Sequence, residues 1–319
     1  MTQAGLAAGA PVRPARPRRR GKKVWPYYVA ISPFFLLFLA FGLYPMVYSL
    51  LLSFQDWNGL GTAEWVGADN FTRLLSDATF WLSIRNTLVI FLLSTVPMLF
   101  FAILVAAMLN SAVKFTTVYR IAYFVPNITS VVAMAVLFGS IFGDRFGLAN
   151  AALQGIGLPA VGWLSTPFGI QITVAILITY QWTGYNAIIF LAGMQSIGSE
   201  VYEAAKIDGA GAIRSFFSIT LPLLRPTIIF VVVVSTITGL QSFTEAQVLT
   251  SSSSITNPNS GGAGQGGLTT VLYFYQQAFN YNRFGYGAAI AWAIFLLVVI
   301  ITVLSWRGAA GRGEKGSRS

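Results

Sequence analysis

Residues 287–305 read GAAIAWAIFLLVVIITVLS, a stretch with no charged side chain that is apolar almost throughout. A helix of about 20 apolar residues crosses the hydrocarbon core of a bilayer, because each residue adds about 1.5 Å along the axis. Five further charge-free stretches are long enough to do the same. The sequence therefore predicts an all-α membrane protein with six transmembrane helices, near residues 28–52, 88–109, 121–142, 170–194, 226–244 and 287–305.

The composition of the whole chain agrees with a membrane protein. Of its 319 residues 55% are hydrophobic and only 9% are charged, whereas a soluble domain carries about 25% charged residues. The sequence has no cysteine and no histidine. This composition excludes thiol catalysis, disulfides, zinc-type sites and histidine acid–base chemistry.

The basic residues give the orientation. Seven of the 20 lie before residue 24 and four follow Trp306. With six spans, 16 basic residues fall on the side of the termini and four on the other side. Because basic residues accumulate in cytoplasmic segments, both termini are predicted to be cytoplasmic. Residues 1–25 and 307–319 are then basic tails of a transmembrane domain of residues 26–306.

Two other charge-free regions are predicted to lie outside the lipid. Residues 147–167 are interrupted by Gly, Pro and Ser, which favour loops. Residues 251–283 open with a serine- and glycine-rich run, Ser251–Gly267, which is too polar for the hydrocarbon region. We therefore expect residues 251–283 to form an extracytoplasmic loop.

The inner loop 195–226 carries a distinct pattern. Residues 202–210 read YEAAKIDGA, in which a short helix ends at an Asp208-Gly209 turn. A second helical stretch with Phe216 and Phe217 follows and could hold the loop against its own spans. The pattern predicts a helix–turn–helix elbow whose small Ala204–Ala205 pair lets another protein approach closely. From periodicity alone, an ordinary solvated loop is an equal alternative.

A resemblance to a known family favours the elbow over an ordinary solvated loop. Glu203-Ala-Ala, Asp208-Gly-Ala and Ile219-x-Leu-Pro222 resemble the EAA loop of permease subunits of bacterial ATP-binding-cassette (ABC) importers. The resemblance covers about residues 27–306 and is strongest to the sugar branch, close to the larger maltose permease and the glycerol-phosphate permeases. The run Ser251–Gly267 departs from that branch, because it is longer and richer in glycine. Further similar segments are residues 44–46, 65–71, 85–88, 119–126, 272–279 and 285–290.

The resemblance implies a type I ABC importer permease fold and the function of a pore-forming permease subunit in the inner (cytoplasmic) membrane of a bacterium. It implies three kinds of partner: a second homologous permease that forms a heterodimer, two cytoplasmic ATPase subunits, and an extracytoplasmic sugar-binding protein. ATP and Mg would be bound by the ATPase partner. The residues expected to couple to the ATPase are Glu203, Ala204, Ala205, Asp208, Gly209 and Ala210.

The chain itself shows no device for binding ATP. Its one Gly-Lys pair, Gly21-Lys22, has no glycine five residues earlier and no Ser or Thr after it, so the phosphate-binding motif GxxxxGK[ST] is absent. We therefore expect a transport subunit without enzymatic activity or a cofactor of its own.

Polar and aromatic residues in span 4 are candidate substrate contacts. Aromatic faces cover the C–H side of sugar rings, and amides satisfy hydroxyl groups. Gln181 lies about 16 Å along the helix from Ile170, at mid-membrane depth. That depth favours a substrate path over an interfacial aromatic belt. The candidates are Gln181, Trp182, Tyr185 and Asn186.

Span 5 carries a polar stripe at helical spacing, although its hydroxyls could equally bond their own backbone. On a continuous helix Glu245 would lie about 27 Å from Thr227, near the outer interface, where solvation and a place on the sugar path are both possible. Spans 4 and 5 contain no Arg or Lys, which predicts a neutral cargo such as a di- or oligosaccharide. The candidates are Ser235, Thr238, Gln241, Ser242 and Glu245.

Two other function classes are weaker alternatives. An ion-coupled secondary transporter usually carries acidic or histidine residues inside the membrane, and only Glu245 qualifies. An intramembrane enzyme would need clustered acidic residues near one interface. The outer-loop acids are spread over irregular sequence without metal-ligand spacing, namely Asp56, Glu64, Asp69 and Asp77.

Overall fold

The computed structural model describes residues 25–111, 116–251 and 260–314. Most of the predicted N-terminal tail (1–24), residues 252–259 of the predicted outer loop and residues 315–319 of the C-terminal tail lie outside these ranges. The chain divides into two compact units, residues 1–48 and 49–319, which are described separately.

The first unit consists of one apolar helical run. It comprises α1 (Trp25–Phe38), a π-helical turn η1 (Leu39–Leu43) and α2 (Tyr44–Leu52), which extends a few residues into the second unit. Residues 27–52 are long and apolar enough to cross a membrane. The run agrees with the predicted span 28–52.

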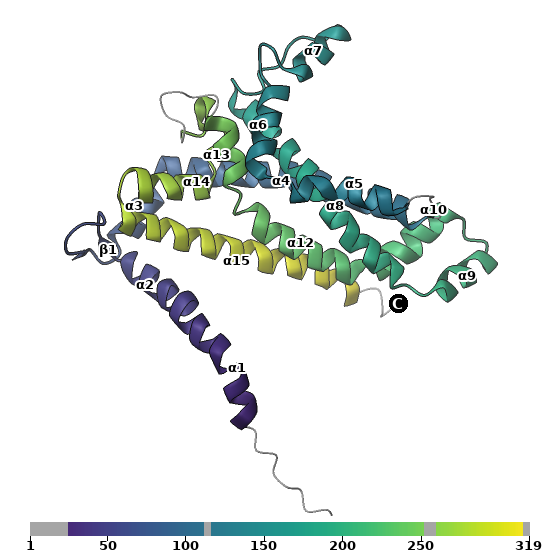
Figure 1. The fold of residues 1–319 in the computed structure, drawn as a ribbon, viewed down its shortest axis with the longest axis horizontal. Coiled ribbons are helices and arrows are strands. Elements are labelled where there is room, and N and C mark those ends of the chain that lie inside the picture. The colour runs from purple at the N-terminus through teal and green to yellow at the C-terminus, as the bar shows by residue number, and fades with distance from the viewer. Residues whose placement is uncertain (1–24, 112–115, 252–259, 315–319) are drawn as a thin grey trace, which may run out of the picture. The chain divides into compact units, whose positions relative to one another are not determined.

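Three straight helices form the frame of the second unit. They are α4 (Ala78–Asn110), α8 (Pro167–Gln195) and α15 (Phe284–Glu314), and each contains a candidate membrane span. α4 packs along α8, while α15 packs against α12 (Arg225–Gly239) (Figure 1). α15 continues past Arg307 into the predicted C-terminal tail.

Two further helix pairs are bent, and the predicted span 226–244 is helical as α12 only as far as Gly239. α5 (Thr116–Ile128) and α6 (Val131–Ile141) meet at 93°, so residues 121–142 are not the single straight helix predicted. Between the two helices Ser130 adopts non-helical backbone angles, with φ at −55° and ψ at 126°. Residues 212–223, which comprise α10 (Ala212–Ser215), η2 (Phe216–Thr220) and α11 (Leu221–Leu223), meet α12 at 65°. Counting each bent pair as one span, the described residues contain up to six.

Short elements occupy the two ends of this unit. α3 (Asp69–Ser76) and the antiparallel pair β1 (Gln55–Asp56) and β2 (Glu64–Trp65) lie at one end, and α9 (Ser199–Ile207) lies at the other (Figure 1). α13 turns away from α12 and packs beside α6 (Figure 1). The remaining elements are α7 (Leu148–Gly155), α13 (Thr244–Ser251), η3 (Ala263–Gln265), α14 (Thr270–Tyr275) and η4 (Gln276–Asn280).

Candidate functional site

A cavity of about 220 Å³ lies between α4, α8, α12 and α13. Eight of the nine predicted substrate contacts line it, although three come from α8 and five from the α12–α13 region, which is far from α8 in the sequence. The cavity is also lined by apolar and small residues of the same helices. The eight predicted residues are Trp182, Tyr185, Asn186, Ser235, Thr238, Gln241, Ser242 and Glu245.

The α8 side of the cavity is aromatic with one buried amide. The rings of Trp182 and Tyr185 lie 5.7 Å apart at 89°, edge to face. The Asn186 amide donates to the Trp182 carbonyl at 3.0 Å and to the Met98 sulfur at 3.3 Å. These contacts fix the orientation of both side chains, which presents an aromatic surface and a polar group to the same space.

The opposite side is built on a break in the helix. α12 ends at Gly239, residues 241–243 are not helical, and α13 begins at Thr244. The break brings Glu245 into the cavity lining. The distance of about 27 Å from Thr227 assumed a continuous helix, and the break at residues 241–243 contradicts that assumption.

Hydrogen bonds hold the break in place. The Thr269 hydroxyl, which caps α14, donates to the Ser242 carbonyl at 2.9 Å, and the Ser242 hydroxyl donates to the Glu245 carboxylate at 3.1 Å. Thr238 instead donates to the Val234 carbonyl of its own helix at 3.1 Å. The alternative that a span-5 hydroxyl bonds its own backbone thus applies to Thr238.

Two differences from the predicted set concern neighbouring helices. Gln181 does not line the cavity: it is 2% exposed, and its Oε1 has no hydrogen-bond partner among the described residues. Its position on α8 turns the amide into the packed interior. Thr95 and Met98 of α4 do line the cavity, and the Ser94-Thr95 pair in an otherwise apolar stretch was the available signal for them.

A buried network attaches the segment of residues 260–270 to the helices around the cavity. The Asn86 amide donates to the carbonyls of Gln265 at 2.8 Å and Leu268 at 3.2 Å, and its oxygen accepts from Gln171 at 2.9 Å. The backbone amide of Thr270 donates to the Thr87 hydroxyl at 2.9 Å. The described part of the predicted outer loop is therefore packed against protein.

Glycines allow this close packing. A Cβ on Gly266 would lie 2.4 Å from the Pro167 carbonyl oxygen at the start of α8, and Gly262 has a φ of +75° that side chains rarely adopt. The glycine-rich composition that distinguishes this loop thus has a structural reason.

At the other end of the unit, the predicted elbow has the expected helix and turn. α9 ends at Ile207, Gly209 has a φ of +77°, and the Ala210 amide donates to the Ala205 carbonyl at 2.9 Å. Tyr202 and Thr220 join α9 to η2 through their hydroxyls at 3.1 Å. The elbow is therefore held to the helix that leads into α12.

Two expectations for the elbow need correction. Ala205 is 6% exposed, so its small side chain packs inside the elbow and does not present a surface to another protein, whereas Glu203, Ala204, Asp208 and Gly209 are exposed and Ala210 is half-buried. Phe216 packs against the α4–α8 core, but Phe217 is 62% exposed. Of these two phenylalanine rings, Phe216 alone holds the elbow to its own spans.

At the opposite end, a cluster around the Asp77 carboxylate (the Asp77 cluster) joins the four elements α3, α4, α14 and α15. Asp77 caps α4 by accepting from two backbone amides, and it also accepts from the hydroxyls of Tyr273 and Tyr286, the latter at 2.6 Å. Burial raises the pKa of Asp77, but these four hydrogen bonds outweigh burial and leave the pKa below its ordinary value of 3.8. Arg73 of α3 lies 4.6 Å from the centre of the Tyr286 ring.

No group of three or more acidic side chains in the described ranges is placed to hold a metal ion. What these ranges offer is a half-polar cavity between helices and an exposed elbow. This arrangement can bind and release a small polar solute.

The comparisons with known proteins identify the class. Residues 80–312 match the family described as binding-protein-dependent transport system inner membrane component. The chain belongs to this family, which confirms the relationship predicted from the EAA pattern. It is a multi-pass membrane protein of the ABC-transporter permease class.

Similar proteins match over most of the chain. The probable ABC transporter permease protein YesP of Bacillus subtilis is 37% identical, over 88% of this chain and 89% of the relative. The lactose transport system permease protein LacF of Rhizobium radiobacter is 35% identical, over 89% and 94%. The arabinooligosaccharides transport system permease protein AraP of Bacillus subtilis is 36% identical, over 89% and 88%.

A solved structure shows the same fold. It is a bacterial ABC transporter involved in the import of the acidic polysaccharide alginate, with a TM-score of 0.76 and 24% identity, covering 90% of this chain and 96% of that one. At this identity the likeness establishes the fold alone.

Proposed function

We propose that the protein is the pore-forming permease subunit of an ATP-driven importer that moves a neutral di- or oligosaccharide across the cytoplasmic membrane. The observation that carries the proposal is the cavity, in which residues of α8 and of the α12–α13 break bring an aromatic surface and polar groups together. Two of the similar proteins are permease proteins of lactose and arabinooligosaccharide transport systems, which supports a saccharide.

The chemistry of the lining supports a neutral cargo. The described residues around the cavity include no Arg or Lys, the side chains that a phosphate or carboxylate would require. Trp182 and Tyr185 offer ring faces for sugar C–H groups, and Asn186, Gln241 and Ser242 offer groups for hydroxyls.

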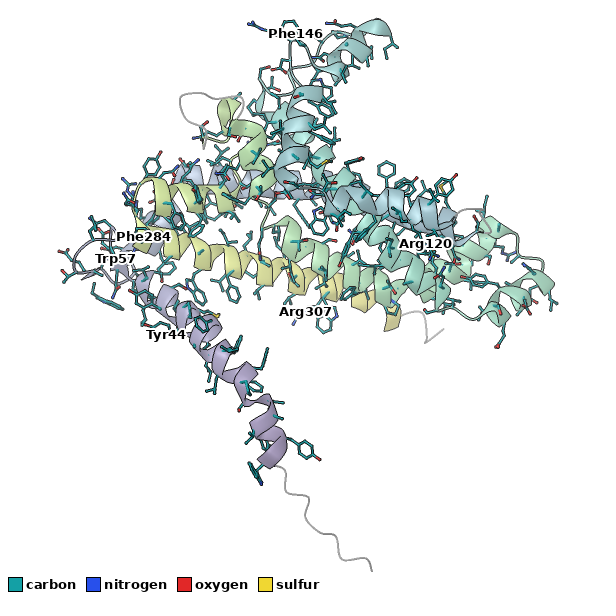
Figure 2. The ribbon with its side chains drawn as sticks, in the orientation of Figure 1. Tyr44, Trp57, Arg120, Phe146, Phe284 and Arg307 are labelled. Carbon is teal, nitrogen blue, oxygen red and sulfur yellow. The ribbon has the colours of Figure 1, made fainter. Side chains whose placement is uncertain are left out.

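The proposed topology has six spans and both termini in the cytoplasm, and the arrangement of the second unit supports a cytoplasmic elbow and C-terminus. α15 ends toward the end that carries α9 (Figure 1), and Arg120 and Arg307 lie toward that end, opposite Trp57 and Phe284 (Figure 2). Basic residues on the side of the elbow agree with a cytoplasmic elbow. α5–α6 then serves as one span, while residues 212–223 belong to the elbow that leads into α12.

The elbow is the proposed link to separate ATPase subunits, which would bind ATP and Mg. Exposed Glu203 and Ala204 would contact the ATPase, while the Gly209 turn and the Tyr202–Thr220 contact transmit its motion to α12. The cavity of about 220 Å³ is smaller than the 300–1,000 Å³ of most ligand pockets. That size supports a second permease that completes the site. We propose that this second permease is a different, homologous chain, so that the pore is a heterodimer, and that a sugar-binding protein is the outer partner.

Reconstituted uptake tests the cargo. The permease, its sister permease, the ATPase and the binding protein are assembled in proteoliposomes and supplied with labelled neutral saccharides, including lactose and an arabino-oligosaccharide. Trp182→Ala should reduce uptake at least tenfold while basal ATP hydrolysis continues. Trp292→Ala, on α15 outside the cavity lining, is the matched control. Equal uptake by both variants would remove the cavity from the sugar path.

A charge reversal tests the elbow. Glu203→Lys should abolish the stimulation of ATP hydrolysis by the loaded binding protein, because the contact with the ATPase changes sign. Glu64→Lys makes the same charge change on β2, at the other end of the unit, and should preserve stimulation. The permease purified alone should show no ATPase activity. Normal coupling in Glu203→Lys would refute the elbow assignment.

A further inference from the structure

Glu245 stands apart from the other groups around the cavity. Of the described residues that line the cavity, it alone carries a formal charge, and that charge is negative. The helix break at residues 241–243 places it there, whereas a continuous α12 would carry residue 245 further outward. A charged side chain at this depth is costly unless it has a function or a partner.

The carboxylate is held in a defined position. It accepts a hydrogen bond from the Ser242 hydroxyl at 3.1 Å, and the Ser242 carbonyl itself accepts one from Thr269 at 2.9 Å. Ser242 and Thr269 are buried, at 7% and 0% exposure. Glu245 is therefore fixed from the segment of residues 260–270, and no basic residue in the described lining neutralises it.

The fold itself does not exclude an acidic cargo, because the similar solved structure belongs to a transporter involved in the import of the acidic polysaccharide alginate. A choice between neutral and anionic saccharides must then depend on side chains. Two like charges about 6 Å apart at an effective dielectric constant of about 20 change a binding constant on the order of 100-fold.

We propose that Glu245, held by Ser242 and Thr269, is the charge-selecting residue of the cavity and rejects saccharides that carry a carboxylate or phosphate. This inference rests on the proposed function and extends it. The absence of basic residues only withholds attraction from an anion, whereas Glu245 actively repels one.

The test compares a neutral saccharide with a derivative in which one primary hydroxyl group is replaced by a carboxylate. The neutral saccharide with the highest uptake in the panel above is oxidised at one primary hydroxyl to a carboxylate. Binding of both is measured by equilibrium dialysis against the assembled permease–ATPase complex in nanodiscs. The binding protein is omitted, since its own selectivity would precede that of the cavity. The readout is the ratio of the two affinities, so a general loss of binding cancels.

Wild type should bind the neutral saccharide at least 30-fold more tightly than its carboxylate. Glu245→Gln should lower that ratio about tenfold, because the shape is kept and the charge is lost. Glu245→Asp keeps the charge and Glu64→Gln removes one on β2, so both should keep the wild-type ratio. An unchanged ratio in Glu245→Gln would overturn the proposal.

A second variant makes the test independent of how Glu245→Gln folds. Gln241→Glu adds a carboxylate to the same lining and should raise the ratio about tenfold; no rise would also count against charge selection in this cavity. If wild type takes up no neutral saccharide of the panel, the proposed cargo fails. If wild type takes up a neutral saccharide but binds the neutral and the carboxylate forms equally, only the charge-selecting role of Glu245 fails.

Discussion

The cavity has one wall made of an unbroken helix, α8, and another made of a helix that stops and restarts, α12–α13. In α8 each backbone group between the ends is bonded within the helix, so the wall is complete in itself. In α12–α13 the carbonyl of Ser242 lies at the break and receives its hydrogen bond from Thr269, 27 residues further along. The broken wall therefore depends on contacts from elsewhere in the chain.

The two walls also differ in what they can do. α8 presents Trp182 and Tyr185 in fixed positions, which suits a binding surface. The break exposes Gln241 and Glu245 at the cavity and supplies polar groups that a regular apolar helix would not. Discontinuous helices typically form the substrate sites of secondary transporters. The following predictions use this contrast, in order of decreasing effect.

The largest effect is expected where another helix touches the straight wall. A Cβ on Gly184 would lie 1.7 Å from the carbonyl oxygen of Tyr123 in α5. Gly184→Val should therefore lower stability by about 3 kcal/mol, seen as loss of monodisperse complex and a lower melting temperature in detergent. Gly198→Ala, where a Cβ meets nothing within 4 Å, is the control. A stable Gly184→Val complex would contradict the observed α5–α8 packing.

The next effect concerns the buried network that holds the segment of residues 260–270. Asn86→Leu leaves the carbonyls of Gln265 and Leu268 and the amide of Gln171 without their bonds, at a cost of about 2 kcal/mol. Thermal unfolding of the assembled complex measures the loss. Ser94→Ala, whose side chain bonds only the neighbouring turn of α4 at 3.2 Å, should change stability far less. Equal losses would mean that the network does not stabilise this region.

A smaller effect separates the two walls directly. Thr269→Val removes the donor to the Ser242 carbonyl and should cost about 1 kcal/mol and weaken saccharide binding. Thr173→Val on α8 removes a bond to the carbonyl of its own helix and should cost less than about 0.5 kcal/mol. Thr269→Ser should restore binding. If both valine variants behave alike, the broken wall needs no outside support.

The smallest effect is a pH dependence at the Asp77 cluster. The pKa of Asp77 is lowered below 3.8 in the folded protein, so its contribution to stability is present above that pH and is lost as the pH falls through the folded value. The difference in melting temperature between wild type and Asp77→Asn should stay constant down to about pH 5 and then shrink. Asp56→Asn is the control. A difference that grows in acid would contradict the lowered pKa.

The local sequence was sufficient for several features. The apolar runs predicted the straight helices, because length and hydrophobicity alone determine whether a helix spans a membrane. The Asp208-Gly209 turn was predictable because glycine adopts a positive φ without strain, and Gly209 has a φ of +77°. The stripe from Ser235 to Ser242 and the cluster from Trp182 to Asn186 identified most of the cavity, because their polarity is unusual in apolar helices.

Other features needed contacts that sequence periodicity does not contain. The bend at Ser130 and the break at residues 241–243 occur in segments with no proline at the break itself. Ala205 and Gln181 face protein because of what packs over them. The position of Glu245 followed from neither hydrophobicity nor helix rise, which assumes an unbroken axis.

The sequence by itself thus determined that this chain is a helical membrane protein of the permease class, with an elbow between its fourth and fifth apolar regions. The tertiary structure decided where the helices break and which side chains meet around the cavity. The physical reason is that a helix in an apolar environment can be interrupted only where distant groups satisfy its open backbone positions. Here those groups come from Thr269, far along the chain from the break that it stabilises.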